Sequence, residues 1–437
     1  MAESTRTGSI WRKITSAYRH WPGIGPVLIV AAMLRLGIIA LTHSYLHPET
    51  WEFGPLGGSI AAGFGYSDLL ENGVRAPSIS MPPAYSYFLA LFYWLGGKGP
   101  VTYLLIQIVQ ALFGVLLVYV VYRLALVLIG ERGAIAAACI TAIYPAQIYM
   151  CNEFHGINIY IVLGTGAVLF LVRYLEETQS WKNLIAAGLC MGLLMLFRAE
   201  APALLLLCAT ILALRGGRKA IGPAIVFVLV ATACLAPWTV RNYREFNKFI
   251  PVCASGGVNL WIGNNPRATG SQHYSFFDPI PPDVKNAFDQ IPLDKNEPIA
   301  KDNALRQLAV SFIRTHPRQE AVLVLKKLFI FFVYDPSHEK GRNLAYWLPS
   351  VLLTVLAIWG AVLRGRKLIR EDIFLIVSIL WSITVSIVVF VLPRYKIVID
   401  PFIIILAANV FAANGLGNLQ RSEGKVAGIP LLKVRAL

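Results

Sequence analysis

The sequence contains few charged residues. Only 14% of its 437 residues are Asp, Glu, Lys or Arg, whereas an ordinary soluble domain has about 25%. Hydrophobic residues make up 56%, and they come in long blocks. A soluble domain of this length would interrupt such blocks with polar faces. The scarcity of charge therefore excludes an ordinary soluble domain and predicts an integral membrane protein.

Acidic residues are the scarcer of the charged types. There are 24 Asp and Glu against 39 Lys and Arg, which gives a formal net charge of +15. A basic protein can bind nucleic acid, but here the basic residues flank apolar runs, as they do in the cytoplasmic loops of membrane proteins. We therefore expect the lipid bilayer, and no nucleic acid, as the partner of these charges.

Cysteine is also sparse, and four of the six cysteines lie inside apolar runs, where cysteine behaves as a small hydrophobe. Cys151 and Cys253 lie nearer to polar segments and could pair across the outer face. No spacing supports a disulfide framework or a zinc site. No small-residue cleavage site follows the first apolar run, so we expect this run to stay as a membrane helix.

The apolar runs predict an all-α polytopic membrane protein. A helix needs about 20 apolar residues to cross a bilayer, and roughly ten runs reach or approach that length, with a range of about nine to twelve. The fifth and sixth are short, which suggests a hairpin broken near 198–202. The candidate spans are 24–44, 101–129, 134–151, 156–174, 183–197, 201–214, 220–237, 345–363, 373–392 and 397–414.

The basic residues predict how these spans are oriented. When ten spans alternate, the Lys and Arg residues of the short loops, among them Arg132, Arg215 and Arg366, lie on one face together with those of both chain ends. Because basic loops stay in the cytoplasm, both termini are expected there.

Polar segments on the opposite face divide the chain into three parts. We expect an N-terminal transmembrane module over 1–237, which includes a first outer loop at 45–98 with interfacial helices. An outer loop region over 238–344 follows, and then C-terminal helices and a tail over 345–437. Within the outer region, the apolar segment 319–333 contains two lysines, which favours an interfacial helix over a span.

Several outer-face residues could carry chemistry. Glu49 and Glu52 follow the first span directly, and a carboxylate beside lipid can have a raised pKa and act as a general base. The alternative for each is a solvated loop acid. Glu153 and His155 form a second polar pair, which could bind a sugar hydroxyl or a divalent metal, although two ligands do not define a metal site.

Arginines on the same face suit a phosphate group. Arg241 precedes Asn242, and Arg394 precedes Tyr395. The planar guanidinium makes paired, charge-assisted hydrogen bonds to phosphate, although an arginine can also extend to lipid headgroups. Arg198 and its neighbour two residues on, Glu200, either neutralise each other or, as charges at membrane depth, have a function.

At these residues the chain resembles the C-type (GT-C) glycosyltransferases, and above all the protein O-mannosyltransferases and lipid A aminoarabinose transferases of bacteria. The resemblance covers almost the whole length and depends on the order of several short motifs. These are an acidic first outer loop, Pro82-Pro83-x-Tyr85, Tyr144-Pro145 followed by Glu153, Leu196-Phe197-Arg198-x-Glu200, Pro237-Trp238-x-x-Arg241-Asn242, Gly256-Gly257-x-Asn259-x-x-x-Gly263-Asn264-Asn265-Pro266 and Pro393-Arg394-Tyr395.

The resemblance implies an inverting transferase that moves a sugar from a polyprenyl-phosphate donor to an envelope glycan, lipid or protein acceptor. The reaction is expected at the periplasmic face of the bacterial inner membrane. Glu52 matches the general base, with Glu49 as the second choice. The resemblance implies donor phosphate or lipid binding by Arg394, Tyr395, Arg241 and Tyr85, and acceptor or sugar binding by Glu153, His155, Asn242 and Asn264.

Two other functions stay open. A flippase or transporter of lipid-linked saccharides would concentrate its polar residues near the bilayer midplane, whereas here they lie mainly at the outer end. A ligase that joins longer glycans would differ only in the size of its acceptor. No cofactor is required by this interpretation, and a divalent metal at Glu153 and His155 is left as an alternative.

Overall fold

The computed structural model describes residues 21–69, 73–176, 179–271, 280–292, 294–335 and 343–423. The basic residues of both chain ends, which contribute to the predicted orientation, lie mostly outside these ranges. Within the described ranges the strands are β1 (Ser67–Leu69) and β2 (Arg75–Pro77), an antiparallel pair in the first outer loop. All other elements described are helices.

Helices of the predicted membrane bundle form most of the chain, and the remaining helices lie in the segments that connect them. The bundle contains α2 (Trp21–Thr42), α5 (Pro100–Ile143), α6 (Pro145–Tyr149), α7 (Ile157–Glu176), α8 (Trp181–Phe197), α9 (Ala201–Gly216), η1 (Gly217–Ala220), α10 (Ile221–Phe246), α16 (Leu344–Arg364), α17 (Lys367–Arg370), α18 (Ile373–Val388) and α20 (Asp400–Glu423). The other helices are α3 (Phe53–Ala61), α4 (Pro83–Gly96), α11 (Gly256–Gly263), α12 (Pro282–Asp289), α13 (Glu297–Thr315), α14 (Pro317–Phe332) and α19 (Pro393–Ile397).

Ten apolar helical segments can be distinguished in the described part of the chain. Five stretches are long and apolar enough to cross a membrane, and two of these each contain two helices separated by a turn. Three shorter apolar helices complete the set, and the all-α polytopic prediction is confirmed. The long stretches are Gly23–Thr42, Pro100–Ile143, Ile157–Glu176, Ala201–Phe246 and Trp347–Arg364, and the shorter helices are Trp181–Phe197, Ile373–Val388 and Asp400–Ala412.

The long helix α5 turns back on itself at Gly130, where φ is 76°. Arg35 of α2 demonstrates the turn, because it touches both halves of α5. Its Nη1 donates to the carbonyl of Ala142 at 3.1 Å, and a Cβ on Gly114 would lie 2.5 Å from its Nε. In a straight helix these two positions would be about 42 Å apart. The charged loop expected between the second and third spans is therefore this turn.

Prolines lie at two of the helix boundaries where the structure can be compared with the spans predicted from hydropathy. The third segment ends at Ile143 and not at residue 151, because Pro145 cannot continue the hydrogen-bond pattern. The predicted break after the fifth segment is present: α8 ends at Phe197 and α9 begins at Ala201, with a proline in its first turn.

Cys151 and Cys253 are free thiols, so the disulfide considered for them is not formed.

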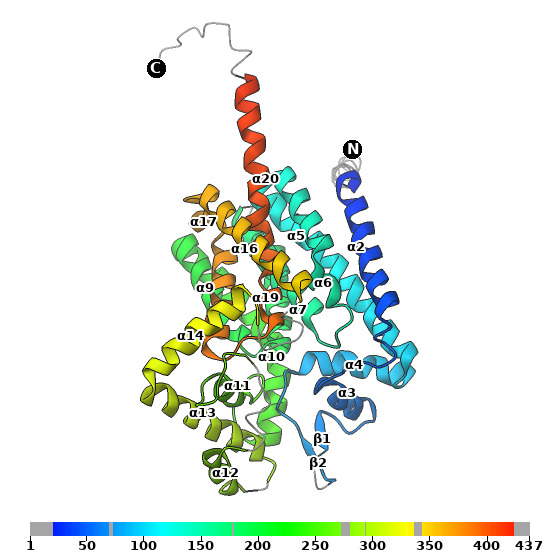
Figure 1. The fold of residues 1–437 in the computed structure, drawn as a ribbon, viewed down its shortest axis with the longest axis vertical. Helices are drawn as coiled ribbons and strands as arrows, with labels where there is room; N and C mark the ends of the chain where they lie inside the picture. The colour runs from blue at the N-terminus through cyan, green and yellow to red at the C-terminus, as the bar shows by residue number, and fades with distance from the viewer. Residues whose placement is uncertain are drawn as a thin grey trace, which may run out of the picture.

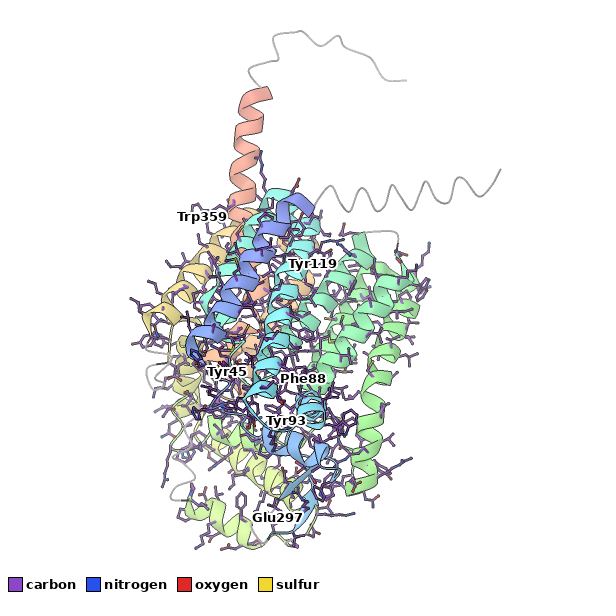
Figure 2. All side chains as sticks on the ribbon, turned by 90° about the vertical axis from the view of Figure 1, so that its right-hand side faces the viewer. Tyr45, Phe88, Tyr93, Tyr119, Glu297 and Trp359 are labelled. Carbon is purple, nitrogen blue, oxygen red and sulfur yellow. The ribbon has the colours of Figure 1, made fainter. Side chains whose placement is uncertain are left out.

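The start of α2 and the end of α20 lie at one end of the molecule, and α3, β1, β2, α12 and α13 lie at the other (Figure 1). Assigning the first end to the cytoplasm stays a prediction. Figure 2 shows Tyr45, Phe88 and Tyr93 where the bundle meets the outer region, with Trp359 near the opposite end. Aromatic side chains favour both membrane interfaces. Segment 317–332 is the helix α14, and its interfacial location also stays a prediction.

Candidate active site

Two adjoining cavities open between the bundle and the predicted outer region. The first cavity, of about 380 Å³, is bounded by the start of α3, the α8–α9 turn, the start of α11, one face of α18, and α19. The second cavity, of about 440 Å³, is bounded by the loop before α3, the segment after α6, and α19. Trp51, His155 and Arg394 line both cavities, so these three residues separate them.

A tight turn before α3 presents Glu52 to the first cavity. The amide of Gly54 donates to the carbonyl of Thr50 at 2.9 Å, and a Cβ on Gly54 would overlap the Thr50 side chain. Trp51 has a φ of 47°, a left-handed conformation that costs a non-glycine residue about 1–2 kcal/mol. Such strain is often found at functional sites. The turn leaves Glu52 exposed, with its side chain lining the cavity.

Arg198 and Glu200 enter the first cavity from the turn between α8 and α9. Nε of Arg198 donates to Oε1 of Glu200 at 2.6 Å. The guanidinium also lies 5.2 Å from the ring centre of Tyr160 and 5.8 Å from that of Tyr395. Glu200 therefore largely balances the charge of Arg198, and two aromatic rings pack near its guanidinium group.

Arg394 is different, because its charge has no counterion in the described part of the chain. Among the residues that the structure describes it forms no ion pair, and its buried Nε has no hydrogen-bond acceptor. It lies on the five-residue helix α19, directly before Tyr395. Burial raises the pKa of Tyr395 to about 12, against the opposing effect of Arg394 and Arg198. Arg394 and the Tyr395 hydroxyl can thus both donate hydrogen bonds to an anion.

His155 lies between the two cavities and is uncharged. Burial lowers the pKa of His155 well below 6.5, and the charges of Arg394 and Arg198 lower it further. Its ring packs edge-on against Phe53 at 5.4 Å, and its buried Nδ1 has no hydrogen-bond partner among the described residues. An uncharged imidazole can accept or donate one hydrogen bond to a ligand without adding charge to the site.

The second cavity contains the other two predicted acids, Glu49 and Glu153. Glu49 is exposed and Glu153 is partly buried next to His155. In the described ranges, no group of three or more His, Cys, Asp and Glu side chains could hold a metal ion. Glu153 and His155 therefore supply two ligands at most from this part of the chain.

Four residues predicted to bind donor or acceptor line neither cavity. Tyr85 is buried behind His155, and its hydroxyl donates to Oε1 of Gln110 at 2.9 Å. The other three, Arg241, Asn242 and Asn264, bind the backbone of the protein. Their described contacts are with the protein itself, so a role for these four residues in binding donor or acceptor stays a prediction.

The contacts of Arg241 explain why it is absent from the cavities. It donates to the carbonyls of Ser78 and Tyr66, each at 2.8 Å, and so fixes the first outer loop to the end of α10. Asn242 donates to the carbonyls of Ile250 at 2.9 Å and Val252 at 3.2 Å. Both therefore stabilise the connections around the cavities.

One face of α18 is a part of the first cavity that sequence reasoning missed. Its lining residues recur at the spacing of a helix face, and the first and last are eight residues, or about 12 Å, apart. The cavity thus extends along α18 into the apolar bundle. Three serines spaced four residues apart in a largely apolar helix, Ser378, Ser382 and Ser386, were the available signal. These lining residues are Trp381, Ser382, Val385, Ser386 and Val389.

Comparisons with known proteins agree with this architecture. Residues 80–240 match the family model described as dolichyl-phosphate-mannose-protein mannosyltransferase. The chain is also similar to the oligosaccharyltransferase of Archaeoglobus fulgidus tethered with an acceptor peptide that contains the NVT sequon. That structure has a TM-score of 0.55 at 14% identity, and the match covers 96% of this chain and 53% of the archaeal one. The chain has the GT-C fold. It spans about half the length of this relative.

Two further structures complete the comparison. AglB from the same archaeon, in complex with an inhibitory peptide and a dolichol-phosphate, has a TM-score of 0.53 at 12% identity, covering 96% of this chain and 53% of AglB. ArnT from Cupriavidus metallidurans bound to undecaprenyl phosphate has a TM-score of only 0.40 at 15% identity, covering 95% and 83%. No curated protein has a matching sequence. The resemblance to GT-C enzymes seen in the motifs is thus confirmed at the level of the fold.

Proposed function

We propose that the protein is an inverting glycosyltransferase that moves a sugar from a polyprenyl phosphate to an acceptor at the outer face of the bacterial inner membrane. The observation that carries the proposal is the content of the first cavity. An acid, Glu52, and an arginine with no ion pair to a described residue, Arg394, line one space that continues along a mostly apolar face of α18 with two serines. A base, a phosphate ligand and a surface for an isoprenoid chain are the three parts this reaction needs.

The acceptor hydroxyl is a weak nucleophile and needs a base as it attacks. In the proposed reaction its oxygen forms a bond to the anomeric carbon, and Glu52 takes its proton. The bond from that carbon to the phosphate oxygen breaks, and the electron pair leaves with the polyprenyl phosphate. Attack opposite to the leaving group inverts the anomeric centre. Glu49, in the second cavity, is the alternative base.

The leaving phosphate gains negative charge as its bond to the sugar breaks, and a fixed cation stabilises this charge best when it needs no reorganisation. Arg394 lies between the cavities, and its buried Nε–H has no acceptor among the described residues, while Tyr395 adds a hydroxyl. Arg198 already shares its charge with Glu200, so we assign it a supporting role. A structure of AglB holds dolichol-phosphate, which supports a polyprenyl-phosphate carrier on this fold.

We assign the second cavity to the body of the acceptor, which can be a glycan, a lipid or a protein. Its reacting hydroxyl is proposed to lie at the boundary with the first cavity, which Glu52 lines. Glu153 and His155 lie where they could orient its hydroxyl group beside Arg394. The outer region also contributes to the first cavity through Ser255 and Asn259 of the α11 segment. This region is therefore proposed to contribute to substrate choice.

Sugar transfer in lipid nanodiscs tests the proposal. The purified protein would be given a panel of radiolabelled polyprenyl-phosphate sugars together with an envelope extract as acceptor. We expect label from at least one donor to move into the extract. If no donor is consumed while lipid-linked sugar changes leaflet, the protein is a transporter and the proposal is wrong.

A further inference from the structure

The end of α11 is joined closely to the end of α18. Gly263 lies so near that a Cβ on it would overlap the carbonyl of Val389. The next residue, Asn264, is fully buried. Its Nδ2 donates to the carbonyl of Val388 at 2.8 Å and to that of Leu260 at 2.6 Å. Asn264 therefore satisfies one of the last carbonyls of α18, which have no partner within the helix.

A buried lysine completes this junction. Lys327 of α14 is fully buried, and its Nζ donates to Oδ1 of Asn264 at 2.6 Å. Oε1 of Glu320, about two turns earlier on α14, is 3.7 Å from the same Nζ. Both ends of the Asn264 amide are thus used, and α11, α14 and α18 meet at this side chain. We call Asn264, Lys327 and Val388 the Asn264 junction.

The elements joined here form different walls of the first cavity. Gly256 and Asn259 line it from α11, and Ser386 and Val389 line it from the end of α18. Arg394 follows Val388 by only six residues. The segment between them makes a hydrogen bond from the amide of Val391 to the carbonyl of Gly270 at 3.0 Å, and its buried Phe390 and Leu392 pack against Trp261 of α11. A shift at Val388 would therefore move Arg394 relative to α11.

We propose that Asn264 is a positioning residue that sets the location of Arg394 through its bond to Val388. It does not touch the substrate itself, since it lines neither cavity. The inference depends on the proposed function in assigning the donor phosphate to Arg394. A displacement of about 1 Å at a reacting site can lower the rate by about a hundredfold, so a distant amide can control the reaction.

The adjacent residue offers a matched control. Asn265 is the same type of residue and is 3% exposed, but within the described residues its side chain binds the last turn of α11 and the loop after it, and not α18. Nδ2 donates to the carbonyl of Trp261 at 2.8 Å, and Oδ1 accepts from the amide of Arg267 at 2.8 Å. Asn265→Leu therefore removes a buried asparagine without releasing α18.

The test compares Asn264→Leu, Asn265→Leu and the wild type in nanodiscs. We expect Asn264→Leu to raise the donor KM, to lower kcat/KM by about tenfold or more, and to speed amide hydrogen exchange over residues 388–396. Asn265→Leu is expected to lower only the melting temperature. The double variant Asn264→Leu/Lys327→Met also removes the lysine that Asn264→Leu leaves buried without its amide partner, so it should recover part of the stability while keeping the raised KM.

A wild-type donor KM and wild-type exchange over 388–396 in Asn264→Leu would overturn the inference. So would a double variant that recovers KM together with stability, because the effect would then be structural. If the wild type transfers no sugar, the proposed function fails. In that case, faster exchange in Asn264→Leu but not in Asn265→Leu would still support the junction, and equal exchange would contradict it.

Discussion

Lys327 leads to a quantitative prediction about how stability changes with pH. Burial lowers the pKa of Lys327 from 10.5 to about 8, and Glu320 opposes this only in part. Below pH 8 the lysine is charged in the folded and the unfolded protein, so the folded state bears the full cost of a buried charge. Between about 8 and 10.5 the folded protein releases the proton and the unfolded chain keeps it. The free energy of unfolding therefore rises with pH across this interval.

The size of the effect follows from the interval. Each pKa unit corresponds to about 1.4 kcal/mol, so the range from about 8 to 10.5 amounts to about 3 kcal/mol. Lys327→Met removes the titrating group and should remove this rise. The stability of the wild type relative to Lys327→Met is therefore expected to increase by up to about 3 kcal/mol between pH 7.5 and 10.5.

Thermal unfolding in detergent over that pH range measures the difference. Lys326→Met is the matched control, since Lys326 is the residue directly before Lys327 on α14 and its side chain is exposed. We expect the control and the wild type to change with pH in parallel, while Lys327→Met loses stability relative to both as the pH rises. Parallel curves for all three proteins would refute the reasoning.

Three other changes have defined outcomes. Arg394→Gln removes the cation proposed to bind the phosphate and should lower the rate of transfer by about a hundredfold, with Arg394→Lys in between. Unchanged transfer would contradict this role. Arg35→Met leaves the carbonyl of Ala142 without its donor and should cost about 1–3 kcal/mol of stability, and an unchanged melting temperature would argue against this cap. A Cβ added to Gly360 of α16 would overlap the backbone carbonyl of Leu406 in α20. Gly360→Val should therefore separate the two helices and lower the yield of folded protein. A well-folded variant at normal yield would show that this close contact is not required.

Much of the bundle was predictable from the sequence, because a bilayer imposes a length on apolar helices. Even the turn inside α5 was expected, since Arg132, two residues after Gly130, separates two apolar runs. The helix ends were less accurate. Hydropathy continues through Pro145 and past Val388, whereas the helical hydrogen bonds stop there.

The candidate site was predictable where a polar residue follows the end of a span. Glu52, His155 and Arg394 lie in such positions and line the cavities, although their roles stay predictions. Arg241 lies in a similar position, but its partners are carbonyls 163 and 175 residues earlier in the chain. Only the fold brings those atoms together. From the sequence alone, an arginine that binds phosphate therefore cannot be distinguished from one that donates to backbone carbonyls.

The most direct test of the account is sugar transfer by Glu52→Gln, with Glu49→Gln as the matched control. Both variants keep the size of the side chain and remove its basicity. We predict that Glu52→Gln still binds polyprenyl phosphate but loses transfer by at least about a hundredfold, while Glu49→Gln stays active. Wild-type transfer by Glu52→Gln would contradict the account, and loss of transfer in Glu49→Gln alone would move the base to the second cavity.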